Sequence, residues 1–174
     1  QRQMCIRDSS RGGWTAASAQ YAEYRSRLRS FATGAGVKVA VIDTGVAAHP
    51  QLRVTPGADF VTPEEPDPLR DCDVHGTVVA GVIAGHELGV APDAEIYSIR
   101  QTSSHYRALP GEGSDGHDSS GTLASLAAAI EDAVDAGARV INVSVVRAFH
   151  QKLPNALITR GWTRPFGCLL YTSD

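Results

Sequence analysis

Short apolar runs alternate along the chain with longer segments of helical period. The runs 37–42 (VKVAVI), 95–99 (EIYSI) and 140–146 (VINVSVV) are rich in β-branched residues and have turn-forming or polar neighbours, so they predict three buried strands. Between the first two, 75–84 (HGTVVAGVIA) is small and apolar, and its length favours a buried helix. Its period alone does not exclude a strand.

Two further segments predict helices. Residues 14–30 are rich in Ala and Arg, and two glycines follow them. Residues 122–136 show the clearest helical period, because the apolar residues of one face recur every three or four positions, namely Leu123, Leu126, Ala127, Ile130 and Val134. We expect Ser119 or Ser120 to cap the start of this helix and Gly137 to end it.

The remaining segments predict loops. Residues 49–68 hold several prolines and clustered acids, and 103–121 is a polar Gly/Ser/His/Asp stretch. Residues 147–167 have no sustained period and are either a true loop or the result of a frameshift or of faulty sequence assembly. The alternation of strands and helices predicts an α/β fold, in which helices cover both faces of a parallel sheet that is truncated near its middle.

Composition narrows the class of protein. Hydrophobic residues make up 43% of the 174 residues, enough for an aliphatic core, and no apolar run approaches the roughly 20 residues of a membrane helix. The net charge of −3 is weak and argues neither for nucleic acid nor for an anionic membrane surface, so we expect no nucleic-acid partner. Residues 1–9 and 168–174 differ in composition from the Ala/Val/Gly-rich middle and resemble translated sequencing adapters. We expect both to be non-native tails, ordinary polar tails being the alternative, which leaves 10–167 as the domain.

The sequence predicts no metal site and no cofactor. Setting the tails aside leaves Cys72, which is either a small buried hydrophobe or half of a disulfide. Five acids lie in one stretch, but their spacing does not match a calcium loop, so a solvated loop is favoured: Glu64, Glu65, Asp67, Asp71 and Asp73. His105 and His117 have no ligand spacing.

Two residues are candidates for chemistry. Asp43 ends the first predicted strand, and functional residues of open α/β sheets gather at the carboxyl ends of strands. His75 opens the small-residue helix, with Gly76 behind it. For each residue taken alone a structural role is favoured, Asp43 as a turn residue and His75 as a capping or satisfied structural histidine.

Together the two positions change the interpretation. The motif D-T-G at 43–45, then H-G-T-x-V-A-G beginning 32 residues after Asp43, resembles the Asp and His blocks of the subtilisin (subtilase) family. The segments G-V-A-P at 89–92 and V-I-N-x-S at 140–144 resemble two further blocks of that family. Within the family, D-C-D-V-H-G-T and S-I-R-Q-T-S are most similar to the mycosins of type VII secretion systems.

The resemblance implies a serine endopeptidase that works through an acyl-enzyme. His75 would be the general base, Asp43 would orient it, and Ser144, Val145 and Val146 would lie along the edge that pairs with an extended substrate. The resemblance also implies a disulfide between Cys72 and an N-terminal extension. It further implies a secreted or membrane-anchored protein that faces outside the cytoplasm, with peptide or protein substrates and a secretion-system membrane complex as a partner.

The chain departs from the family pattern at one decisive point. The nucleophile block G-T-S-x-A-x-P and the block A-A-G-N that holds the oxyanion-hole asparagine are both absent from the 174 residues. We therefore expect the chain as given to be the N-terminal part of such a protease and to be inactive. The alternative is a non-catalytic subtilase-like module of a secretion complex. A nucleotide-binding domain is disfavoured, because no G-x-G-x-x-G follows the first strand.

Overall fold

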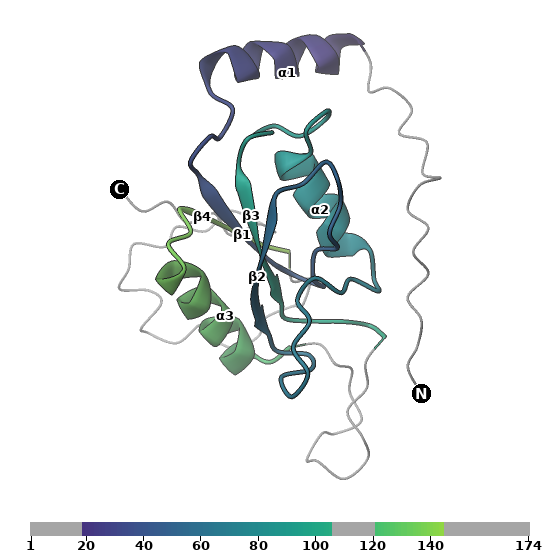
Figure 1. The fold of residues 1–174 in the computed structure, drawn as a ribbon, viewed down its shortest axis with the longest axis vertical. Helices are drawn as coiled ribbons and strands as arrows, with labels where there is room; N and C mark the ends of the chain where they lie inside the picture. The colour runs from purple at the N-terminus through teal and green to yellow at the C-terminus, as the bar shows by residue number, and fades with distance from the viewer. Residues whose placement is uncertain (1–18, 106–120, 145–174) are drawn as a thin grey trace.

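The computed structural model describes residues 19–105 and 121–144 (Figure 1). Four parallel strands form one sheet in the order β2-β3-β1-β4, and three helices accompany them. The strands are β1 (Lys38–Asp43), β2 (Val54–Asp59), β3 (Glu95–Arg100) and β4 (Val140–Val143). The helices are α1 (Ala19–Phe31), α2 (His75–Ala84) and α3 (Leu123–Asp135). The α/β fold predicted from the sequence is confirmed.

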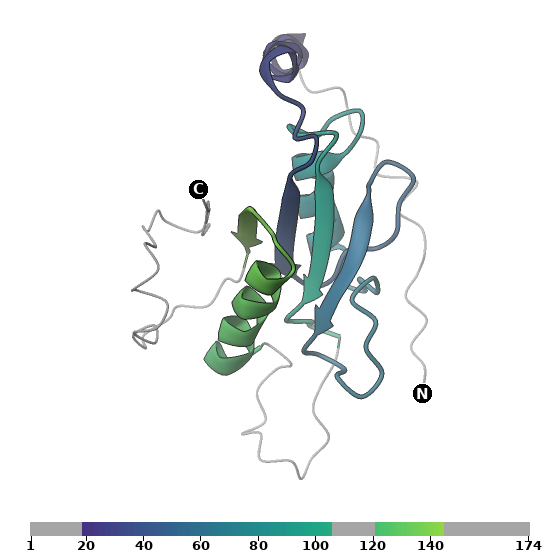
Figure 2. The same ribbon diagram turned by 60° about the vertical axis from the view of Figure 1, so that its left-hand side comes forward.

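The central strand β1 sorts its side chains between two cores. Val39 and Val41 pack with α2 on one face, whereas Ala40 and Ile42 pack with α3 on the other. This division follows from the two-residue period of a strand. Figures 1 and 2 show α2 and α3 on opposite sides of the sheet. Full burial of each Val or Ile side chain contributes about 1.5–3 kcal/mol, so β1 is fixed firmly from both sides.

Strand β2 lies inside the segment 49–68 that was expected to be a loop, so that expectation was wrong. The sequence V-T-P-G-A-D conceals the strand, because Pro56 and Gly57 are typical loop residues. β2 is an edge strand that pairs with β3 alone, and an edge strand tolerates a proline. The Tyr97 ring packs so closely over Gly57 that a Cβ there would lie 2.7 Å from it. The register shifts between Pro56 and Asp59.

The helices follow the predicted period, with one error at a cap. Segment 75–84 is a helix rather than a strand, and α3 lies within the predicted 122–136. The N-cap of α3 is Thr122, whose Oγ1 accepts the Ser125 N–H at 3.1 Å, so neither Ser119 nor Ser120 caps it. Thr122 stands directly before the first helical residue, where a cap must be. Gly137, at φ 76°, follows α3 as expected.

Several expectations concern residues outside the described part of the chain. These are the non-native tails at 1–9 and 168–174, the segment 147–167 and the start of the first predicted helix at 14–18. Cys72 is disulfide-bonded, which decides between the two roles left open for it. The other two cysteines of the sequence, Cys5 and Cys168, are not among the described residues. None of the described helices is long and apolar enough to cross a bilayer.

A buried ion pair joins the ends of β2 and β3. Arg100 Nη1 lies 3.1 Å from Asp59 Oδ2, and both side chains are almost fully buried. Burial alone would raise the pKa of Asp59, but the backbone N–H groups of Asp67, Thr62 and Val61, together with the charge of Arg100, hold it below its usual value. The loop after β2 is therefore folded around a charged carboxylate.

Candidate active site

The fold brings Asp43 and His75 together. Asp43 is the last residue of β1 and His75 the first of α2, and His75 Nδ1 lies 2.7 Å from Asp43 Oδ1. The Asp43 side chain is 2% exposed, whereas that of His75 is 55% exposed. One member of the pair is thus held inside the protein, and the other presents its ring at the surface.

The contact with Asp43 sets the state of the imidazole. A carboxylate accepts, so Nδ1 carries the proton and donates it to Asp43 Oδ1, which leaves the lone pair of the neutral ring on Nε2. None of the described residues bonds Nε2. The same Asp43 oxygen accepts the backbone N–H of Thr44 at 2.7 Å. The arrangement is that of a general base whose orientation is fixed from behind.

The threonines of the two motifs hold this geometry. Thr44 Oγ1 accepts the Gly76 N–H at 2.9 Å, so the residue after Asp43 bonds the residue after His75. Thr77 Oγ1 in turn accepts the Ala47 N–H at 2.9 Å. The end of β1 and the start of α2 are thereby joined twice, which explains why D-T-G and H-G-T each contain a threonine.

Gly76 fills a position that has no room for a side chain. An added Cβ would overlap the carbonyl oxygen of Gly45 and lie 3.1 Å from the Asp43 Cβ. Gly45 has φ 101°, and a Cβ added there would lie 2.7 Å from the Arg70 carbonyl oxygen, which is too close. The close approach of these two glycine backbones is what lets His75 reach Asp43.

We expect Gly76→Ala to destabilise the chain, because the new methyl group would push α2 away from β1. Overpacking of this kind costs about 1–3 kcal/mol. Gly81→Ala is the matched control in the same helix, since a Cβ there meets nothing within 4 Å and alanine is the better helix former by about 1 kcal/mol. Urea unfolding of both variants measures the difference. Equal urea midpoints for the two variants would show that the close contact at Gly76 does not limit stability.

The surroundings raise the pKa of His75 above 6.5. The hydrogen bond to Asp43 is the largest cause; burial acts in the opposite direction, and the negative charges of Asp43, Asp71 and Asp73 add to the increase. The imidazolium is therefore stabilised. A general base accepts a proton and later releases it, and a pKa near neutrality suits both steps.

Two acids of the stretch that was expected to be solvated are instead hydrogen-bonded, so that expectation was wrong for them. Asp71 accepts hydrogen bonds from Thr44, the residue after Asp43, and from Thr77, two residues after His75. Asp73 binds Ser103 Oγ at 2.6 Å, His105 Nδ1 at 3.1 Å and the hydroxyl of Ser104. Burial would raise the pKa of Asp73, but these bonds hold it below its usual value. Within the described residues, no group of His, Cys, Asp or Glu has the arrangement of a metal site.

The residue before His75 has an unusual backbone. Val74 has φ 67° and ψ −13°, a left-handed conformation that a β-branched residue rarely adopts. Such a conformation costs about 1–2 kcal/mol. No periodicity in the sequence indicates it, because glycine is the usual signal for a left-handed turn and this position holds a valine.

The predicted substrate edge is only partly described. Ser144 follows β4, and its Oγ accepts a hydrogen bond from Asn142 Nδ2 at 2.7 Å. Val145 and Val146 lie outside the described residues. The described contact of Ser144 is with Asn142 and not with the Asp43–His75 pair. The substrate-binding role of this edge therefore stays a prediction.

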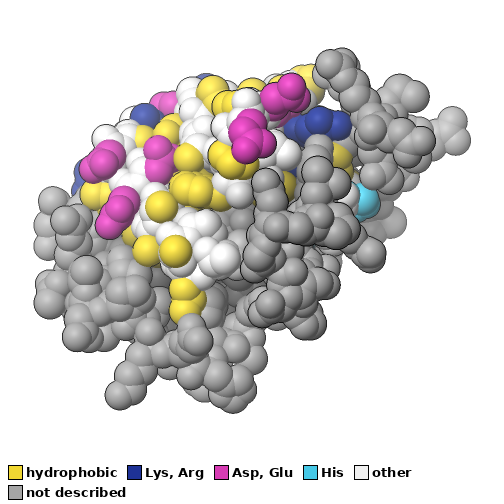
Figure 3. Space-filling model, turned by 90° about the horizontal axis from the view of Figure 1, so that it is seen from below, with side chains coloured by type: hydrophobic (Ala, Val, Ile, Leu, Met, Phe, Trp, Pro, Cys, Tyr) yellow, Lys and Arg dark blue, Asp and Glu magenta, His cyan; other side chains and the backbone are white. Residues whose placement is uncertain are grey.

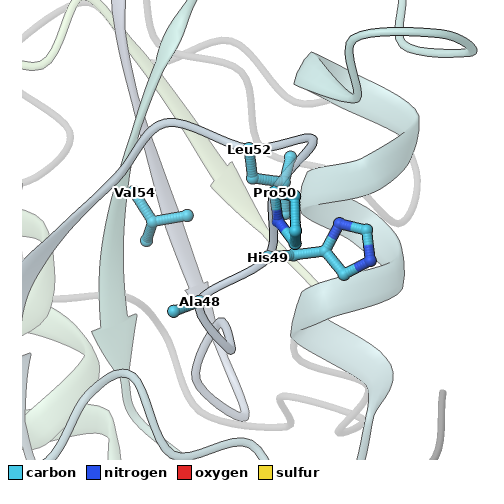
Figure 4. A pocket seen from close by; sticks show the side chains of 5 residues that line it. All are labelled: Ala48, His49, Pro50, Leu52 and Val54. Carbon is cyan, nitrogen blue, oxygen red and sulfur yellow. The ribbon is translucent and has the colours of Figure 1, made fainter. Parts of the chain in front are cut away.

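A pocket of about 270 Å³ lies on the loop between β1 and β2 (Figure 4). Its lining is mainly aliphatic, with one imidazole: Ala48, His49, Pro50, Leu52 and Val54. Neither Asp43 nor His75 lines it, so the Asp43–His75 pair lies outside this pocket. On the described surface at the carboxyl ends of the strands, acidic and hydrophobic side chains lie beside one another (Figure 3).

Comparison with known proteins agrees with this geometry. The model of the Subtilase family, Peptidase S8, matches residues 34–160. Mycosin-1 of Mycobacterium tuberculosis is 42% identical over 134 residues, which are 71% of this chain and 30% of that protein. The crystal structure of MycP1 from the ESX-1 type VII secretion system superposes with a TM-score of 0.63 at 38% identity, covering 70% of this chain and 34% of the other.

A third match is the periplasmic assembly from the ESX-5 inner membrane complex. It gives a TM-score of 0.65 at 34% identity and covers 78% of this chain and 40% of the matched one. The chain thus spans about a third of the length of the relatives it matches. The family match covers most of the chain, and it includes the Asp43–His75 pair and the two threonines that hold it. The chain therefore belongs to the subtilase family of peptidases, and its sequence and fold are of the mycosin type.

Proposed function

We propose that the chain forms the Asp–His part of a serine endopeptidase that cleaves peptide or protein substrates. The observation that carries the proposal is the 2.7 Å contact between His75 Nδ1 and Asp43 Oδ1, with Nε2 unbonded by the described residues. A buried carboxylate behind an exposed imidazole is the orienting half of a Ser–His–Asp triad. The family match supports the same reaction.

In this mechanism, His75 Nε2 removes the proton of a serine hydroxyl as the serine oxygen attacks the scissile carbonyl carbon. The proton then passes from Nε2 to the leaving amine, and the acyl group stays on the serine. Water hydrolyses the ester by the same route, with His75 again as base and then as acid. Asp43 stays ionised throughout and stabilises the imidazolium. The nucleophile is supplied from outside the 174 residues, which contain no G-T-S-x-A-x-P.

The substrate would lie extended along Ser144, Val145 and Val146. Backbone hydrogen bonds to such an edge give affinity for any sequence, and side-chain pockets give specificity. Solved structures similar to this chain include MycP1 from the ESX-1 type VII secretion system and an intact ESX-5 inner membrane complex. These similarities support a location outside the cytoplasm and a secretion-system membrane complex as a partner.

The test begins with sequencing of the source locus through both ends of this reading frame. A downstream G-T-S-x-A-x-P would allow the complete gene product to be assayed on a fluorogenic peptide library. We expect hydrolysis by that product and none by the 174-residue chain. Hydrolysis by the 174-residue chain that His75→Ala abolishes would contradict the proposal.

The alternative is a non-catalytic subtilase-like module of a secretion complex. The 174 residues contain no nucleophile block. This absence favours the alternative if the complete gene also encodes no serine motif downstream. A stop codon at this position, or a downstream block with the serine replaced, would make this alternative the leading interpretation. Binding to components of a secretion complex would then be the activity to measure.

We expect kcat/KM of the complete gene product to rise with pH with a midpoint above 6.5. Only neutral His75 accepts the serine proton, and its pKa is raised, so the protein must be taken to higher pH before the base is available. Added salt should move the midpoint down, because it screens Asp71 and Asp73 while leaving the direct bond to Asp43. Profiles at low and high salt measure both effects, and a midpoint below 6.5 would refute this assignment.

A further inference from the structure

We propose that Asp71 is a positioning residue for His75. Its carboxylate fastens the first turn of α2 and the strained turn before it to the end of β1, and so aims the imidazole at Asp43. This inference rests on the proposed function, in which His75 is the general base. Neither the family match nor the similarity to mycosins assigns a role to this residue.

Both carboxylate oxygens of Asp71 are used. Oδ1 accepts Thr44 Oγ1–H at 2.8 Å and the Val74 N–H at 2.8 Å. Oδ2 accepts the Thr77 N–H at 2.9 Å and Thr77 Oγ1–H at 2.6 Å. Thr44 is the neighbour of Asp43, and Val74 and Thr77 stand on either side of His75. A single side chain therefore connects the backbone that carries the acid to the backbone that carries the base.

The bond to Val74 has a second consequence. A carboxylate that accepts an N–H three residues later closes a tight local turn, and it can hold that turn in a conformation its residues would not choose. Val74, at φ 67°, is such a residue, and His75 follows it directly. If Val74 relaxed to an ordinary φ, the chain would enter α2 at another angle and the imidazole would leave Asp43.

The negative charge of Asp71 also helps to hold His75 in place beside Asp43. It lies at the amino end of α2, where a negative group is stabilised by the unpaired N–H groups of the first turn. It also favours the imidazolium, together with Asp43 at the end of β1 and Asp73 in the same loop. Loss of Asp71 should therefore affect both the position and the pKa of His75.

The first experiment is NMR on the 174-residue chain. It measures no catalysis, so the missing serine nucleophile does not matter. The readout is the His75 Nδ1–H resonance, which is protected from exchange while it is bonded to Asp43. We expect Asp71→Ala to lose it and Asp71→Ala/Val74→Gly to regain it, because glycine adopts the left-handed turn without strain. Asp67→Asn removes an exposed charge from the same loop and should leave the signal unchanged.

The second experiment uses the complete gene product. We expect Asp71→Ala to lower kcat about 10- to 100-fold with KM nearly unchanged, the effect of a misplaced base. The conservative Asp71→Asn keeps one acceptor oxygen, so it should lose less of kcat than Asp71→Ala and move the midpoint of the pH profile down.

An Asp71→Ala protein that keeps both the His75 signal and its kcat would overturn the proposal. So would failure of Val74→Gly to restore either the signal or the fold of Asp71→Ala. If the gene product is inactive while the NMR results hold, the proposed function fails and the positioning role of Asp71 stands.

Discussion

Replacement of His75 by alanine is expected to lower kcat of the complete gene product about 10⁵- to 10⁶-fold, the size of effect seen when a triad histidine is removed. The reason is local, since no other described group lies against Asp43 in a position to take the serine proton. Asp43→Asn should cost about 10⁴-fold, because it would favour the wrong tautomer of the ring without removing it. Burst and steady-state kinetics on a fluorogenic peptide measure both effects.

The control for this experiment lies at the other end of the same helix. His86 is exposed just beyond α2, and its described contact is a backbone N–H bond to Gln51. His86→Ala should therefore leave kcat unchanged. Because the His75 side chain is about half exposed, His75→Ala should also unfold at nearly the parent urea concentration. A His75→Ala enzyme with more than about a hundredth of parental kcat would remove His75 from the role of base.

Removal of the Asp59 carboxylate is expected to have the largest effect on stability. Asp59→Ala would remove the carboxylate that lies 3.1 Å from the buried Arg100 guanidinium. Removing one partner of a buried ion pair costs about 3–5 kcal/mol. Domains of this size are stable by only about 5–15 kcal/mol. Much of the chain should therefore be unfolded at 25 °C in mild urea.

The exposed pair Arg53–Asp93 is the matched control, at 3.5 Å and with both side chains well exposed. Asp93→Ala should change the free energy of unfolding by less than about 1 kcal/mol. The pKa of Asp59 is lowered in the folded state, so its contribution is present above the unfolded value and is lost as the pH falls through the folded one. A loss of under about 1 kcal/mol for Asp59→Ala at neutral pH would mean that water solvates Arg100.

Local pattern was sufficient to predict much of this architecture. β1 and α3 have clear hydrophobic patterns, and the length of the small apolar segment favoured a helix for α2. The D-T-G and H-G-T motifs fix where Asp43 and His75 stand on these elements. β2 was missed because a proline and a glycine conceal a strand that exists only through its pairing with β3. Asp71 was missed because its role depends on three backbone segments that meet only in the folded chain.

The order of strands in the sheet has a consequence for how the chain reaches this state. β1 pairs with β3, 57 residues further along, and with β4, about 100 residues further along. At about 5–20 residues per second, a ribosome takes roughly 3–11 seconds to make the chain between β1 and its first partner. During that time the strand with the most buried residues has nothing to pair with. Folding dominated by such distant contacts is slow, so a chaperone that shields β1 should raise the yield of native protein.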